Sequence, residues 1–157
     1  MLYIQHRFVC LMKIMQISDK DTQEINPQLC PLMRLLVISR KFEKVYRKYF
    51  NKLNVTQSQV SILLMVAKIG EIAQSAIGKQ LELERSTVSR DLARLIDKGY
   101  LHKTANGVSP NISLTKEGIK VAKLVAREWE KGYKDSCDLL GKKGMNALGE
   151  IEKTIKK

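Results

Sequence analysis

Residues 85–94 place arginine and hydroxyl side chains within one short segment of helical periodicity. Val88, Leu92, Leu95 and Ile96 recur at helical spacing and predict a single apolar face. The rest of the segment's surface carries its polar side chains: Arg85, Ser86, Thr87, Ser89, Arg90 and Arg94. Arginine forks and small hydroxyls can bond to phosphate oxygens and base edges. The pattern therefore favours contact with a nucleic acid, and Gly99 is suited to end the helix.

The same side chains also have purely structural interpretations. Ser86 and Thr87 could cap the start of the helix. Arg90 could form an ion pair with Asp91 or Glu84. Both interpretations stay open on the residues alone, because the polar face can meet a nucleic acid only if the neighbouring elements hold it outward.

The neighbouring segments supply such a scaffold. Thr56-Gln-Ser-Gln59 is a capping-box pattern that opens a mostly apolar helix, which Gly70 ends. Residues 72–81 predict a short helix, and Leu83-Glu84 joins it tightly to the helix that starts at Arg85, which is typical of a helix-turn-helix. Residues 100–103 and 111–114 predict two strands around an Asn106-Gly107 turn. A hairpin at this place predicts the winged variant of the motif.

Two longer helical regions flank these elements. Asn26-Pro27 and Pro31 precede a helix with one apolar and one strongly basic face, and we interpret most of its basic residues as solvated surface. Thr115 can cap a helix over residues 116–140, whose predicted apolar stripe comprises Ala122, Val125, Trp129, Tyr133, Ser136 and Leu140. Gly141 and Gly144 are expected to break it before a last helix. The apolar seams left over at both ends favour packing against a second copy of the chain.

Composition narrows the classes of partner. The chain has 157 residues, 44% hydrophobic residues and a net charge of +12, which fits one compact domain or two small lobes and a polyanionic partner. The three cysteines Cys10, Cys30 and Cys137 have no metal-ligand or disulfide spacing, so neither a metal nor a cofactor is predicted and a reducing cytoplasm fits best. No apolar run is long enough to span a membrane. With His6 and His102 as the sole histidines, acid–base catalysis is poorly served and an enzyme is not expected.

The order of elements resembles the multiple-antibiotic-resistance regulator (MarR) family of bacterial transcription factors. The resemblance covers residues 29–157 and is carried by Leu53–Leu64, Ile77–Leu81, Arg85–Leu95 with Lys98-Gly-Tyr-Leu, and Leu114–Gly118. It implies a homodimer in which each recognition helix enters a major groove of a pseudo-palindromic operator in double-stranded DNA. Ser86, Thr87, Ser89 and Arg90 would face the groove, and Arg85 and Arg94 would lie nearer the phosphates.

The wing departs from the family pattern. Family wings usually carry Asp-x-Arg, whose arginine reaches the minor groove, whereas residues 104–111 here contain neither an arginine nor an acid. Lys103 and Asn106 are the remaining candidates for a contact with DNA, and Asn106 also suits a turn. Specific recognition would then depend more heavily on the helix.

The resemblance also implies a small-molecule effector. Trp129, Tyr46 and Tyr49 could line its pocket, although such aromatic residues usually belong to a core. Cys30 resembles in position the reactive cysteine of the organic-hydroperoxide-sensing branch. That branch has tyrosines where Arg34 and Lys44 stand here, so a buried packing cysteine is the favoured interpretation and a redox sensor the alternative.

Together these patterns predict a mainly α fold with a small β-hairpin wing: a winged helix-turn-helix plus a helical dimerisation region. Residues 54–115 would form the DNA-binding lobe, and residues 29–53 and 116–157 the dimerisation region. Residues 1–28 are expected to be an extension, either disordered or upstream of a true start at Met12 or Met15. The predicted function is a sequence-specific repressor released by a ligand or an oxidant, and the alternative is a non-specific or architectural nucleic-acid-binding protein.

Overall fold

The computed structural model describes residues 26–104 and 110–155, so the expected extension lies almost wholly outside the described residues. The chain divides into two compact units, residues 1–40 and 41–157. The first contains the short 3-10 helix η1 (Pro27–Leu29) and the start of α3 (Pro31–Phe50). Every residue of α3 within this unit is exposed.

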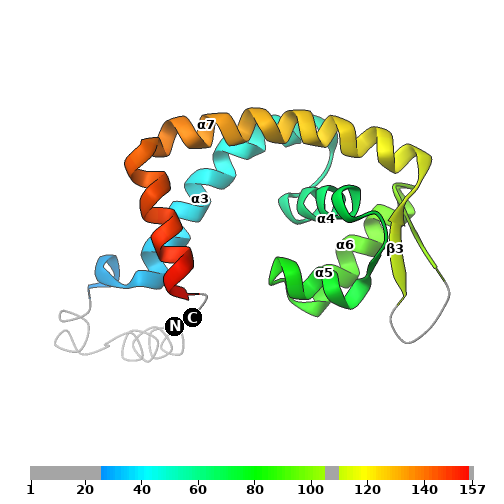
Figure 1. The fold of residues 1–157 in the computed structure, drawn as a ribbon, viewed down its shortest axis with the longest axis horizontal. Helices are drawn as coiled ribbons and strands as arrows, with labels where there is room; N and C mark the ends of the chain where they lie inside the picture. The colour runs from blue at the N-terminus through cyan, green and yellow to red at the C-terminus, as the bar shows by residue number, and fades with distance from the viewer. Residues whose placement is uncertain (1–25, 105–109, 156–157) are drawn as a thin grey trace, which may run out of the picture. The chain divides into compact units, whose positions relative to one another are not determined.

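The second unit contains the remaining helices and all the strands that the structure describes. After α3 come η2 (Asn51–Leu53), α4 (Gln57–Ile69), β1 (Ile72–Ala73), α5 (Gln74–Leu81), α6 (Arg85–Asp97), β2 (Leu101–Lys103), β3 (Asn111–Leu114) and α7 (Lys116–Ile155). Within this unit α4 lies between α7 on one side and α6 on the other (Figure 1). A mainly α fold with a helix-turn-helix and a wing is confirmed.

The core of this unit forms around α4. Val60, Ile62, Leu63 and Val66 are buried there. The other helices and the strands of the sheet cover them with further buried side chains, including Ile77, Val88, Leu92, Leu95, Leu101, Ile112 and Val125. The predicted capping box fixes the start of α4: the Gln59 N–H donates to Thr56 Oγ1, and the Thr56 N–H donates to Gln59 Oε1, each over 3.3 Å.

The sheet has one strand more than the predicted hairpin. Its order is β1-β3-β2, and both pairings are antiparallel, with Ile72 opposite Ile112 and Leu101 opposite Leu114. The prediction of a continuous helix over residues 72–81 was wrong at its start, because Ile72 and Ala73 are extended and pair with the wing. This pairing ties the start of α5 to β3.

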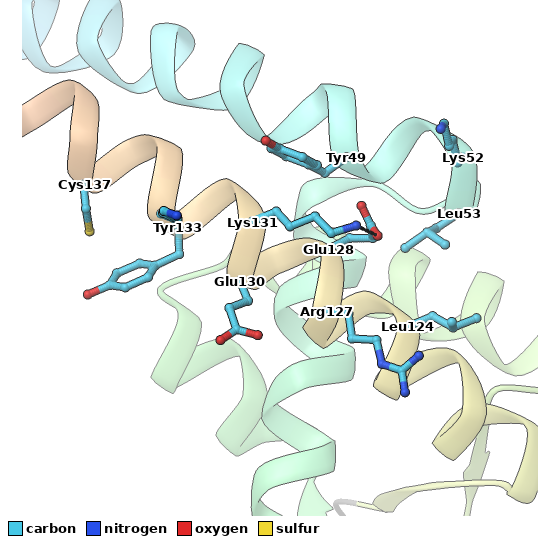
Figure 2. Close-up of a pocket in the computed structure, with 11 residues that line it drawn as sticks. Tyr49, Lys52, Leu53, Leu124, Arg127, Glu128, Glu130, Lys131, Tyr133 and Cys137 are labelled. Carbon is cyan, nitrogen blue, oxygen red and sulfur yellow. Dashed lines mark hydrogen bonds and ion pairs between the residues drawn. The ribbon is translucent and has the colours of Figure 1, made fainter.

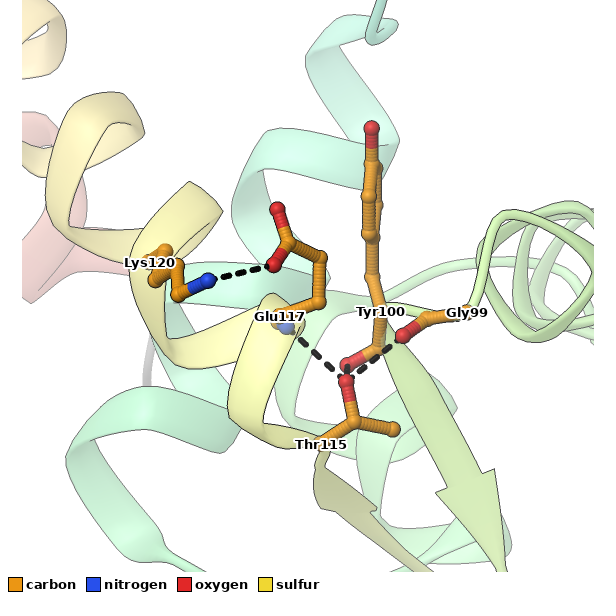
Figure 3. Close-up of polar contacts among 6 residues, drawn as sticks. Gly99, Tyr100, Thr115, Glu117 and Lys120 are labelled. Atoms are coloured by element: carbon orange, nitrogen blue, oxygen red, sulfur yellow. Dashed lines mark hydrogen bonds and ion pairs between the residues drawn. The ribbon is translucent and has the colours of Figure 1, made fainter.

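A polar joint connects the end of α6, the wing and the start of α7 (Figure 3). Thr115 Oγ1 accepts from the Gly118 N–H over 2.9 Å, which confirms that Thr115 caps α7, and it donates to the Gly99 carbonyl over 2.6 Å. Gly118 lies against Tyr100, where a Cβ atom would stand 1.8 Å from the carbonyl oxygen. One threonine and one glycine thus fix where α7 leaves the sheet.

The long helix α7 agrees with its prediction in part. The expected break is confirmed at Gly141, where a non-helical φ of 59° makes a kink between two helical parts, whereas Gly144 does not interrupt the second part. Trp129 and Tyr133, two members of the predicted apolar stripe, are 37% and 47% exposed. Ala122, Val125 and Ser136 of the predicted stripe are buried. Gly132, which was not part of the predicted stripe, is also buried, and a Cβ atom on it would lie 2.5 Å from the Tyr46 ring of α3.

Within the described residues, no helix is both long enough and apolar enough to cross a membrane.

Candidate nucleic-acid interface

The helix α6 presents a polar face because its opposite face is buried. Val88, Leu92 and Leu95 pack into the core, as predicted, and Ile96 is half-buried. The exposed residues Ser86, Ser89 and Arg90 then follow one another on the outward side. We call these three residues the reading face. Thr87 is half-buried, so it lies at the edge of this face.

Neither structural interpretation of the reading face matches the geometry. The N-cap residue of α6 is Glu84, so Ser86 and Thr87 lie inside the first turn and not at the cap position. Among the described residues, no ion pair involves Arg90. Its Nε donates to the Ser86 carbonyl over 3.2 Å, which holds the side chain along the helix and leaves its terminal nitrogens for another acceptor.

The basic residues beside this face fall into two groups. Arg85 and Lys103 line one hollow together with Lys79, Gln74 and other residues of α5 and the wing. Arg94 lines a different hollow, with Lys98 and residues at the start of α4. The structure therefore brings Arg85 and Lys103 together and places Arg94 apart from them. Asn106 lies outside the described residues.

The contact between Gln59 and Asp91 was not predicted from the sequence. Both residues are buried, at 2% and 5% exposure, and Gln59 Nε2 donates to Asp91 Oδ1 over 3.2 Å. Because Gln59 Oε1 also closes the capping box, one amide joins the start of α4 to the middle of α6. Lys98 Nζ adds a second link, to the Asn54 carbonyl over 2.5 Å. The sequence did hold one signal of this contact, because the acidic Asp91 stands among the apolar residues Val88 and Leu92 of the buried face.

The two described cysteines have different surroundings. Cys30, expected to be buried, is exposed, and so is every residue of the α3 segment that follows it, up to residue 40. Cys137 is half-buried on α7. Its hydrogen bond with Tyr133 raises the pKa of that phenol above its usual 10.0, and the Tyr133 ring stacks on Trp129 with 5.3 Å between centroids.

A second site of charge lies where α3 meets α7. Asp135 Oδ2 accepts from Lys48 Nζ over 2.5 Å and from the Tyr49 hydroxyl over 2.6 Å. The bond from Lys48, and then the one from Tyr49, lowers the pKa of Asp135, while the bond to Asp135 raises the pKa of Lys48. Beside this contact is an open hollow of about 900 Å³ (Figure 2), lined by Tyr49, Lys52, Leu53, Leu124, Arg127, Glu128, Glu130, Lys131, Tyr133, Lys134 and Cys137.

The fold and the exposed face of α6 define a winged helix-turn-helix protein of the DNA-binding class. The MarR family profile matches residues 55–107. The organic hydroperoxide resistance transcriptional regulator of Bacillus subtilis is 30% identical over 101 residues, which cover 62% of this chain and 67% of that protein. MarR of Salmonella typhimurium is 26% identical over 109 residues, which cover 65% and 74%. The chain belongs to the MarR family of transcriptional regulators.

Solved structures share the same fold. A mutant of Escherichia coli MarR in complex with operator DNA matches with a TM-score of 0.71 and 20% identity, over 82% of this chain and 95% of that one. NadR in complex with 4-hydroxyphenylacetate matches with a TM-score of 0.69 and 20% identity, over 81% and 95%. The similarity extends beyond the elements from α4 to β3, which we call the winged lobe, since it covers about four fifths of the chain.

Proposed function

We propose that the protein is a sequence-specific repressor that binds a pseudo-palindromic operator as a homodimer, with one α6 in each of two major grooves. The reading face is the observation that carries this proposal. Ser86, Ser89 and Arg90 are exposed on a helix whose other side is fixed by the core. Arg85 and Lys103 flank the start of the helix, where phosphates border the groove. The relative solved with operator DNA supports the same docking.

Arg90 is the residue that tests this proposal. A guanidinium that contacts a guanine edge contributes about 1–3 kcal/mol to discrimination. Because Arg90→Ala removes this contact from both copies of the homodimer, it is expected to weaken operator binding by roughly 30-fold or more. Binding to the upstream region of the protein's own gene, titrated against a scrambled duplex at fixed salt, measures this loss. Lys68→Ala, which removes an exposed charge from the same lobe, serves as the control and should retain specific binding. Tight specific binding by Arg90→Ala would rule out its assigned role.

Release from the operator completes the proposed function. NadR is a relative solved with an aromatic carboxylate, which supports an effector of that kind here, and the exposure of Cys30 supports oxidation as a second route. Titrations of the protein–operator complex with 4-hydroxyphenylacetate and with an organic hydroperoxide separate the two routes. Release by hydroperoxide should be lost in Cys30→Ser and kept in Cys137→Ser. Retention of the response in Cys30→Ser would remove Cys30 from the mechanism.

This function places the protein with the chromosome in the cytoplasm. The alternative of a non-specific or architectural DNA-binding protein differs in one measurable quantity, the ratio of operator to random-duplex affinity. One observation favours a non-specific component beside the specific one: most of the positive charge lies outside the winged lobe.

A further inference from the structure

Most of the excess positive charge of the chain lies outside the lobe that carries the reading face. Residues 54–115, which include the whole winged lobe, hold seven basic and five acidic side chains. Residues 41–53 and 116–138, a shorter total length, hold eleven basic and six acidic ones. These belong to α3, η2 and the first part of α7. A chain that needed charge solely to bind the operator would be expected to place it beside α6.

The charge in α3 and α7 is gathered on an exposed surface. One open hollow is lined by four of these cations: Lys52, Arg127, Lys131 and Lys134. Lys44 lies nearer the start of α3, one turn before Lys48. All are exposed. We call Lys44, Lys52, Arg127, Lys131 and Lys134 the outer basic surface. Figure 2 shows three of them, Lys52, Arg127 and Lys131, at the hollow, where Arg127 points away from the Lys131–Glu128 contact.

Ion pairs neutralise much of the acid near this surface. Glu128 pairs with Lys131, and Asp135 pairs with Lys48. Glu130 is the further carboxylate that lines the hollow. Among the described residues, Lys44, Lys52, Arg127 and Lys134 have no ion pair. The surface thus presents several cations that are free to bind an external anion.

The α7 residues of this surface lie on a different side of the lobe from the reading face. The buried positions of α7, such as Ala122 and Val125, face the core, and α4 separates α7 from α6 (Figure 1). Arg127 and Lys134 are exposed on α7 instead. The α7 part of the outer basic surface is therefore separated by α4 from a duplex held by α6.

We propose that the outer basic surface binds a second segment of duplex DNA through its phosphates, without reading sequence, so that the protein can bridge two segments. Duplex DNA offers one negative charge about every 1.7 Å, which suits several lysines and arginines spread along two helices. The polymer is also present at high local concentration once α6 is bound, because the flanking DNA is tethered. The proposal goes beyond operator recognition: bridging needs α6 to hold a duplex but does not need it to read a specific sequence.

Two matched triple variants test this. The outer variant carries Lys52→Gln, Arg127→Gln and Lys134→Gln; the control variant carries Lys68→Gln, Lys142→Gln and Lys143→Gln, which are equally exposed and equally without ion pairs among the described residues. Both lose three charges. Affinity for a random duplex is measured over a series of salt concentrations. The outer variant should bind roughly tenfold more weakly, with a salt slope lower by about 2–3, because each lost phosphate contact removes about 0.9.

A capture assay tests the bridging itself. The wild type is bound to an immobilised duplex and offered a second, labelled duplex of random sequence. We expect capture by the wild type and by the control variant, and loss of capture by the outer variant, while its binding to the upstream region is retained. Circular dichroism confirms that each variant is folded.

Three results would overturn the proposal. The wild type could fail to capture a second duplex, or the outer and control variants could lose affinity equally, which would reduce the effect to net charge. Binding to phosphatidylserine vesicles through this surface, without duplex capture, would instead identify a membrane surface. Because the random-duplex titration needs no operator, its outcome is separate from the result for Arg90→Ala.

Discussion

Asp91 brings a carboxylate into the apolar interior behind the reading face of α6. Its Oδ1 accepts from Gln59, and its Oδ2 has no partner among the described residues. A buried polar atom left without a hydrogen bond costs about 1–3 kcal/mol, so this pair does not make the fold more stable than an apolar pair would. The hydrogen bond between Gln59 and Asp91 does join the start of α4 to the middle of α6 at one fixed pair of positions.

A double-mutant cycle measures that coupling. Gln59→Leu should lower the free energy of unfolding by about 2–3 kcal/mol, because it leaves the Asp91 carboxylate buried without its donor. The double variant Gln59→Leu, Asp91→Leu should recover much of this loss, since both polar groups are then replaced. The part that is not recovered belongs to the capping box, in which Gln59 also takes part. Urea unfolding of the four proteins gives the energies; strictly additive losses would mean that the two side chains are not coupled.

Asp135 gives the contact between α3 and α7 a dependence on pH. Its pKa is lower in the folded protein than the ordinary value of 3.8, through Lys48 first and then Tyr49. The carboxylate therefore stabilises the folded state above that ordinary value, and the contribution is lost as the pH falls through the folded pKa. Asp135→Asn should be less stable than the wild type near neutral pH, and the difference should shrink in acid. Thermal unfolding from neutral pH to pH 3 measures it.

The control for this dependence is Asp138→Asn, an exposed residue of the same helix with no ion pair among the described residues. The stability of Asp138→Asn should differ little from that of the wild type between neutral pH and pH 3. A gap between Asp135→Asn and the wild type that stays constant in acid would show that the carboxylate contributes packing and not charge.

Among the elements, α7 depends most on how it leaves the sheet. Gly118 lies against the Tyr100 backbone, and the added Cβ atom of Gly118→Ala would stand 1.8 Å from the carbonyl oxygen and 2.8 Å from the carbonyl carbon. Backbone atoms cannot move aside as a flexible side chain can, so the joint that Thr115 holds together must open. We expect a loss of about 1–3 kcal/mol in the free energy of unfolding, the usual cost of overpacking.

Gly149 provides the matched control within the same helix. A Cβ atom there meets nothing within 4 Å, so Gly149→Ala should raise stability by up to about 1 kcal/mol through helix propensity. Opposite signs for the two substitutions, measured by urea unfolding, would separate the joint from a general effect of alanine. A neutral Gly118→Ala would contradict the close approach at Tyr100.

The elements that could be predicted from sequence are those with a local signal. Periodicity and turn chemistry identified α4, α6 and the wing, and the caps at Thr56 and Thr115 were correct because a cap needs only residues within one turn. The strand β1 could not be predicted, because two residues become a strand only through pairing with β3. Trp129 was misplaced because the buried position belongs to Gly132, where the Tyr46 ring of a distant helix needs the space.

The candidate site also has one part that the sequence predicts and another that only the structure reveals. The reading face followed from side-chain types on one helix, whereas the contact between Gln59 and Asp91 joins residues 32 positions apart and depends on the packing of α4 against α6. The separation of Arg94 from Arg85 and Lys103 also required the structure, because it depends on which neighbouring elements border each end of α6.

The whole molecule exposes more apolar surface than a single chain should. In the first unit Leu32, Leu35 and Leu36 are exposed on α3. In the second, Leu148, Ile151 and Ile155 are exposed beyond the kink of α7. Burial of such side chains is worth about 1.5–3 kcal/mol each. A second copy of the chain that covers them would also supply the second α6 that a two-fold operator requires.

Charge placed among Leu148, Ile151 and Ile155, the exposed apolar seam of α7, should therefore separate the two copies of the proposed homodimer. The double variant Leu148→Glu, Ile151→Glu is expected to elute as a monomer of 17.9 kDa, against a wild type of about twice that mass, in size-exclusion chromatography with light scattering. Asn146→Glu adds charge two positions from Leu148, hence on nearly the opposite side of the helix, and should remain dimeric. Because the seam is distant in sequence from the winged lobe, the monomer should keep its helical circular dichroism. Its operator affinity should fall steeply, since one α6 then binds one half-site; a double variant with the mass of the wild type would contradict this interface.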